Sequence, residues 1–224
     1  MIIHHAKNIR PAQDPRFMVF GERNTGTNFL QKLIEVNFEK EFTNLIMWKH
    51  WMGFVGQKPS DISKVLAVGI IRDPINWLCS MKNSSPHAEH MSDLDWPGFL
   101  QNQWWSKHDN PDYGYEIMED RDFETKERYA NILKMRSKKL SWILDPPVSC
   151  PFILVRYEDL ITDMPAVMTL IGQTFSLKMP NTFTNVSKDW KHGGEYRPRT
   201  YPRPTPDLIP FIREQLDWNL EAKV

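Results

Sequence analysis

The sequence has few cysteines, no excess of either charge and no long apolar run. Its 224 residues include only Cys79 and Cys150, too few for a disulfide framework, which favours a reducing compartment. Lysine plus arginine equals aspartate plus glutamate at 28 each, so no overall field favours nucleic acid or an anionic membrane. No apolar stretch has the length of a membrane span or of a signal-peptide core. We therefore expect a soluble, cytoplasmic protein with no nucleic-acid partner.

Short runs of β-forming residues alternate with segments of helical periodicity, which predicts an α/β fold with a mainly parallel sheet covered by helices. The predicted strands are 17–20, 45–48, 65–71 and 152–155. Apolar residues at helical spacing predict helices over about 29–38 and 129–144. Candidate N-caps of helices are Thr125, Asp163 and Asp207, the last for a C-terminal helix through Leu220.

One domain is expected over residues 1–224, because no linker or change in composition divides the chain. The segment from about 83 to 122 differs from the rest, being polar, aromatic and punctuated by proline and glycine. A stretch of that length with little periodicity is typical of a functional insertion or lid. No heptad repeat announces an interface between copies of the chain, so the oligomeric state stays open.

The most informative stretch is FMVFGERNTGTNF, residues 17–29, where an apolar run leads through a GxxxxGT turn into a helical segment. Glycines allow the tight turn, and the N–H groups and helix dipole that follow converge on an anion. A nucleoside triphosphate loop continues with lysine and then serine or threonine, whereas Gly26 is followed by Thr27 and Asn28. The turn predicts a phosphate site without the usual equipment for magnesium ATP.

Two further motifs follow predicted strands. In IIRDPINWLCS, residues 70–80, Arg72 leaves the end of an apolar strand and Ser80 falls about two turns into the next helix. In LVRYEDLITDMP, residues 154–165, another strand ends in charged and aromatic residues that include Tyr157. Ligands in open α/β sheets bind at the carboxyl ends of the strands. We therefore expect Arg72 and Ser80 to face the first turn and to offer a second phosphate site.

Together the three motifs resemble the sulfotransferase family, the P-loop-like enzymes that use 3′-phosphoadenosine 5′-phosphosulfate (PAPS). Loops that read YPKSGTTW, RNPKDVAVS and YEDL in cytosolic members have counterparts here in GERNTGTNF, RDPINWLCS and RYEDL, in the same order. Arginine and serine stand eight residues apart in both versions of the second motif. The resemblance begins at about residue 16 and covers most of the chain, but not the insertion or the C-terminal tail.

The resemblance implies a P-loop NTPase-like, three-layer sulfotransferase fold and a reaction without an obligatory metal. Sulfonate would move from PAPS to a hydroxyl of a carbohydrate or small metabolite, with 3′-phosphoadenosine 5′-phosphate (PAP) as the product. Residue by residue, the resemblance implies that the 5′-phosphosulfate is held by Thr25, Gly26, Thr27 and Asn28. It implies that the 3′-phosphate is held by Arg72 and Ser80. The adenine would be flanked by Phe29 and Tyr157. A basic segment similar to the family's loop over the 3′-phosphate adds the candidates Lys188, Lys191 and Arg197.

The chain departs from the family at Asn24, which stands where the first loop has a lysine that stabilises the leaving oxygen. Three alternatives are open: Arg23 reaches in, Lys49 takes the role, or the fold binds the nucleotide without transferring anything. The segment WKHW, residues 48–51, makes His50 the expected base and Lys49 the expected charge stabiliser.

Two rival functions belong to other classes. A P-loop nucleotide or metabolite kinase would need magnesium ATP, and a non-catalytic module would bind the nucleotide or a sulfated glycan. The histidines lack the cysteine partners or the helical HxxxH spacing of a metal site, so none is predicted.

Overall fold

The centre of the computed structural model is a four-stranded sheet of order β1-β4-β3-β2. The structure describes residues 3–5, 15–44, 48–53, 65–110, 112, 114–146, 150–186 and 198–223. The strands are β1 (Ile3–His5), β2 (Arg16–Phe20), β3 (Val65–Ile71) and β4 (Phe152–Arg156). β2, β3 and β4 run parallel, and β1 pairs antiparallel with β4 at the edge. Three predicted strands are thus confirmed, and the fourth, 45–48, lies largely outside the described residues.

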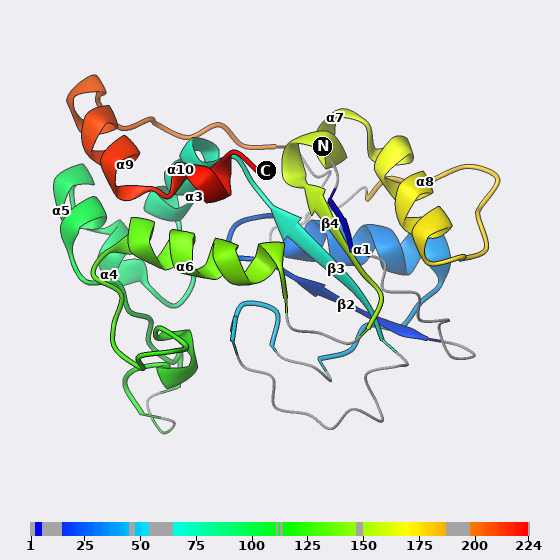
Figure 1. The fold of residues 1–224 in the computed structure, drawn as a ribbon, viewed down its shortest axis with the longest axis horizontal. Helices are drawn as coiled ribbons and strands as arrows, with labels where there is room; N and C mark the ends of the chain where they lie inside the picture. Colours follow the sequence, from blue (N-terminus) through cyan, green and yellow to red (C-terminus); the bar gives the residue numbers. More distant parts are fainter. Residues whose placement is uncertain are drawn as a thin grey trace.

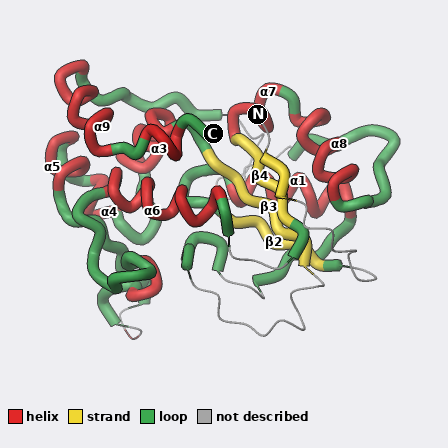
Figure 2. The backbone as a smooth tube through the Cα atoms, in the orientation of Figure 1, coloured by secondary structure: helices red, strands yellow, loops and turns green. Residues whose placement is uncertain are grey.

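Helices and short 3-10 turns flank the sheet and are joined by loops (Figures 1 and 2). In chain order they are α1 (Thr27–Phe38), α3 (Pro74–Asn83), α4 (Glu89–Ser92), α5 (Trp96–Gln101), η2 (Met118–Asp120), α6 (Ile132–Leu144), α7 (Tyr157–Thr162), α8 (Met164–Thr174), η3 (Pro206–Leu208), α9 (Ile209–Gln215) and α10 (Trp218–Glu221). Within this described part, no helix has the length and apolarity that a bilayer crossing needs.

Side chains that alternate along β2 separate the core into two layers. Phe17 and Val19 pack with α1 and α8 on one face of the sheet, whereas Met18 and Phe20 pack with α6 on the other. Successive residues of a strand point to opposite faces, so both faces of this strand are covered. The predicted α/β architecture, a sheet between helical layers, is therefore present (Figure 1).

The 83–122 insertion is part of the packed core. It carries α4, α5 and η2 between loops (Figure 2). Its residues Phe99 and Trp104 are 0% and 1% exposed, in a third apolar cluster with Trp77 of α3 and Leu133 of α6. A detached lid would not bury such rings. The irregular sequence pattern concealed short helices whose apolar residues serve a shared core.

Two predicted helix boundaries are wrong and one is confirmed. Asp163 caps α8 by accepting a bond from the Ala166 N–H at 3.1 Å. Thr125 does not cap α6, because Asn131 does so six residues later through the Lys134 N–H at 2.9 Å. The C-terminal helix is broken into η3, α9 and α10, since Asp217 starts a new helix by accepting from two N–H groups.

Candidate functional site

The first turn, residues 21–27, leaves β2 at the carboxyl end of the sheet and enters α1 at Gly26. Gly26 has φ +95°, and a Cβ placed on it would lie 2.6 Å from the Tyr157 ring. Only glycine fits that combination of left-handed backbone and close approach. No side chain among the described residues caps α1. The dipole and first N–H groups of this helix end therefore face toward the turn, and within the described residues its N-cap position supplies no side-chain acceptor.

Most predicted ligand-binding side chains of this turn are engaged in holding it. The Asn24 amide donates to the carbonyls of Ser80 at 3.1 Å and Ser84 at 2.6 Å, and the Thr25 hydroxyl donates to the Glu22 carbonyl at 2.7 Å. Thr25 is fully buried, and Thr27 and Phe29 are also buried. Asn28 accepts a hydrogen bond from the Lys49 ammonium.

The second turn places Arg72 beside the first. Its Nη1 donates to the Asn24 carbonyl at 3.0 Å, and its guanidinium lies over the Tyr157 ring at 4.6 Å. Arg72 is 9% exposed, and its Nε has no hydrogen-bond partner within the described ranges. Ser80, on α3, is 6% exposed and receives the Asn24 amide at its carbonyl. The expected meeting of these residues at one edge of the sheet is therefore observed.

The third motif closes the group from β4. Tyr157 begins α7 and packs against both Gly26 and Arg72. Glu158, the next residue, accepts a hydrogen bond from the main-chain N–H of Asp73 at 3.0 Å, which ties the third motif to the second. The three motifs therefore meet in one continuous group of residues, the candidate site, at the ends of β2, β3 and β4.

Lys49 and His50 both contact the first turn. The Gly21 N–H donates to the Lys49 carbonyl at 3.0 Å, and His50 Nδ1 lies 2.7 Å from the Gly21 carbonyl. A carbonyl only accepts, so Nδ1 carries the proton and Nε2 is the basic nitrogen. Burial, and then the nearby charge of Arg23, holds the pKa of His50 well below its ordinary value. The ring is therefore neutral at pH 7.

Arg23 points into a buried ion-pair group. Its Nη1 donates to Asp120 of η2, which also accepts from Lys139 of α6 and from the Ser106 hydroxyl. Burial raises the pKa of Asp120, but the charges of Arg23 and Lys139 outweigh it and keep that pKa below its usual range. The guanidinium lies 5.7 Å from the centre of the Trp48 ring. Its Nε and Nη2 have no hydrogen-bond partner among the described residues.

A second buried group lies behind the first turn. Glu22 Oε2 pairs with Arg136 Nη1 at 2.9 Å, and the guanidinium of Arg136 also binds Glu221 of α10. Burial raises the pKa of Glu22 to about 7 despite the charges of Arg136 and Lys139. None of the three sequence motifs pointed to Arg136, Lys139, Asp120 or Glu221. Only the inward helical spacing of Arg136 and Lys139 with Leu140 and Ile143 could have signalled the first two.

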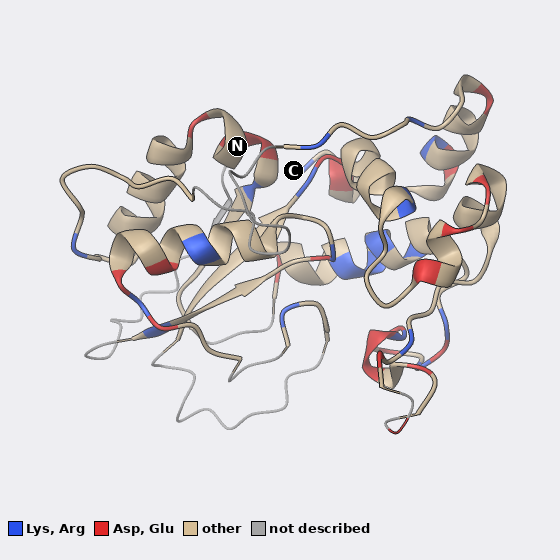
Figure 3. Ribbon diagram, turned by 180° about the vertical axis from the view of Figure 1, so that it is seen from behind, with Lys and Arg blue, Asp and Glu red and all other residues tan. Residues whose placement is uncertain are grey.

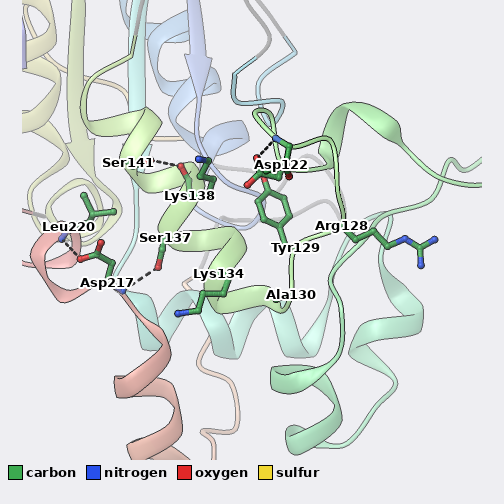
Figure 4. A pocket seen from close by; sticks show the side chains of 11 residues that line it. Asp122, Arg128, Tyr129, Ala130, Lys134, Ser137, Lys138, Ser141, Asp217 and Leu220 are labelled. Carbon is green, nitrogen blue, oxygen red and sulfur yellow. Dashed lines mark hydrogen bonds between the residues drawn. The ribbon is translucent and has the colours of Figure 1, made fainter.

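A separate groove of about 370 Å³ runs along the outer side of α6 (Figure 4). Lys134 in its wall donates to the Gln215 carbonyl at 3.0 Å, Lys138 pairs with Glu124 at 2.6 Å, and Arg128 pairs with Glu116 at 2.7 Å. Each cation is engaged by the protein, and basic and acidic residues are interspersed over the elements (Figure 3). This groove therefore does not present an anion site.

Comparisons with known proteins leave the family open, because no family model matches the chain and no match is found among curated proteins. The predicted 3′-phosphate residues Lys188, Lys191 and Arg197 lie outside the described residues. In the ranges that are described, no group of three metal-ligating side chains comes together.

Proposed function

We propose that the carboxyl end of the sheet binds an adenosine 3′,5′-phosphate nucleotide and that the protein is a PAPS-dependent sulfotransferase. The observation that carries the proposal is the bond from Arg72 Nη1 to the Asn24 carbonyl, which joins the two turns. One turn offers a helix end whose N-cap residue, Gly26, has no side chain, and the other offers a buried guanidinium. Two anion-binding elements side by side suit a ligand with two separated phosphate groups.

The first turn would hold the 5′-phosphosulfate through its main chain. Because the side chains of Asn24 and Thr25 are bonded within the protein, and the Thr25 N–H donates to the Glu22 carbonyl, the N–H groups of residues 26–28 and the dipole of α1 would do the binding. Arg72 and Ser80 would hold the 3′-phosphate. Tyr157 would support both, since it packs on Gly26 and under Arg72.

Lys49 is the better candidate for the missing loop lysine. Its ammonium reaches Asn28 in the first turn of α1, whereas Nη1 of Arg23 is bound to Asp120. In the transfer, the acceptor oxygen bonds to sulfur while the bond from sulfur to the bridging phosphate oxygen breaks. Lys49 would stabilise the charge on that leaving oxygen. His50 Nε2 would take the acceptor proton, leaving PAP and a sulfate ester.

Thermal unfolding with equal concentrations of PAP, magnesium ATP and AMP tests the proposed ligand. At about 100 times its dissociation constant, a ligand that binds only the folded protein adds ~2.7 kcal/mol, a shift of several degrees. A shift selective for PAP supports the proposal. A shift with magnesium ATP instead favours the rival kinase, and no shift with any of them contradicts a nucleotide site.

Substitutions separate binding from chemistry within the site. Arg72→Ala should weaken PAP binding by about 10–100-fold, because a charge-assisted contact to phosphate is lost. His50→Ala should keep PAP binding and lose most turnover, about 100-fold or more. Calorimetry with PAP and a sulfonate-transfer assay measure the two effects. His90→Ala is the matched control, because the His90 ring packs at a tilt against Trp105 in the insertion, away from the candidate site. Unchanged activity in both site variants would refute these assignments.

A further inference from the structure

Arg136 is a fully buried arginine of α6 that no motif of the candidate site contains. It is 0% exposed, and its partners Glu22 and Glu221 have side chains 1% and 2% exposed. A buried guanidinium without partners would cost several kcal/mol. Its place in the core is therefore explained only by what its nitrogens contact.

Those contacts reach both turns of the site. Nη1 binds Glu22 Oε2 of the first turn at 2.9 Å, and Nη2 donates to the main-chain carbonyl of Arg72, in the second turn, at 2.9 Å. A second connection runs through Trp77. The guanidinium lies 5.0 Å from the centre of that ring, whose Nε1 donates to the Arg23 carbonyl at 2.9 Å.

The C-terminal helix α10 holds this guanidinium in place. The Glu221 carboxylate accepts one hydrogen bond from Arg136 Nε and one from Nη2, the latter with Nη2 at 2.8 Å from Oε2. This two-bond arrangement fixes the plane of the guanidinium and hence the directions of its other donors. Lysine could not replace it, because a single ammonium group lacks the planar set of donors that binds the two carboxylates of Glu22 and Glu221 and the Arg72 carbonyl at once.

From these contacts we infer that Arg136 is a positioning residue that sets the spacing between the two turns. Through that spacing it makes the site selective for a nucleotide with both 3′- and 5′-phosphates. The inference rests on the proposed function. A ligand with one phosphate uses one turn and tolerates a change in the spacing, whereas a bisphosphate must meet both turns at once. Arg136 touches no ligand and acts through Glu22, Trp77 and the main chain at Arg72.

The test measures dissociation constants of PAP and AMP for wild type, Arg136→Met, Arg136→Lys and Ile143→Ala. The readout is the ratio of the AMP constant to the PAP constant, which a general loss of stability does not change. We expect both Arg136 variants to lower this ratio by about tenfold or more, because misplacement by about 1 Å is enough to lose a matched contact. Ile143→Ala opens a cavity in the same helix, within the cluster under β2 and β3, and should keep the ratio within about twofold.

The outcomes separate this inference from the proposed function. A wild type that does not prefer PAP to AMP overturns the proposed function, and the inference with it. A selective wild type with an unchanged ratio in folded Arg136 variants overturns the inference alone. If neither Arg136 variant folds, Glu221→Gln keeps the shape of the anchor and removes its charge. It should lower the ratio less than tenfold, and an unchanged ratio in folded Glu221→Gln also overturns the inference.

Discussion

The two turns at the carboxyl end of the sheet occupy equivalent places but begin their helices in opposite ways. α1 starts after Gly26 in a left-handed conformation, with no side-chain cap among the described residues. α3 starts after Asp73, whose carboxylate accepts the Asn76 N–H at 2.8 Å, with Pro74 in its first turn. An uncapped helix end can take an anion on its main chain, whereas a capped one already holds a carboxylate. In the proposed site, the second turn would therefore bind its phosphate through side chains such as Arg72.

Gly26→Ala should break this contrast most severely. The added Cβ meets the Tyr157 ring at 2.6 Å, and alanine is strained at φ +95°, so we expect a loss of about 4 kcal/mol in unfolding free energy. The PAP-induced shift in unfolding temperature should disappear. Gly114→Ala is the matched control, because Gly114 has φ +91° and nothing within 4 Å of a Cβ. Equal losses in both variants, with the PAP shift kept, would show that the close approach at Gly26 is not needed.

The first turn also differs in having a buried carboxylate behind it. Burial raises the pKa of Glu22 from 4.5 to about 7, so the folded state holds this proton more tightly than the unfolded chain. The contribution to stability is present below pH 4.5 and is lost as the pH rises through 7. Between pH 5 and 8, the unfolding free energy of the wild type should fall by about 3 kcal/mol relative to that of Glu22→Gln. Parallel curves of unfolding free energy against pH for the two proteins would contradict this expectation.

The sequence predicted the parts of these turns that depend on local patterns. Strand β3, the glycine of the first turn and the helix opened by Pro74 follow from hydrophobic runs and from residues with special backbone preferences. Arg136 was missed because its partner Glu22 lies 114 residues away in the chain. Asp120 was missed because its partner Arg23 lies 97 residues away. No local pattern predicts such pairs, which form only after the insertion and α6 pack behind the sheet.

The helix boundaries also separate features that local patterns predict from features that depend on packing. Asp163 was recognised as a cap because the helix begins directly after it, and Thr125 failed because irregular chain intervenes before Asn131. Apolar spacing marks that a helix exists, but several polar residues upstream of it can each accept an N–H bond. Packing then selects one of them. Here the isolated bridge between Trp104 and Tyr129 pairs the chain with the insertion two residues before the N-cap Asn131.

Asp73→Ala should change the unfolding free energy least of the three substitutions. It sharpens the contrast between the two helix ends, because it removes the cap from α3 and makes the second turn resemble the first. We expect a loss of about 1 kcal/mol in unfolding free energy, measured by urea denaturation. Asp73→Asn is the matched control, since an asparagine oxygen also caps and only the charge is lost. Both variants remove a negative charge next to Arg72 and should bind PAP slightly more tightly. If Asp73→Asn loses as much unfolding free energy as Asp73→Ala, the carboxylate acts through its charge and not as a helix cap. The difference between a capped and an uncapped helix end would then no longer explain why the second turn depends on Arg72.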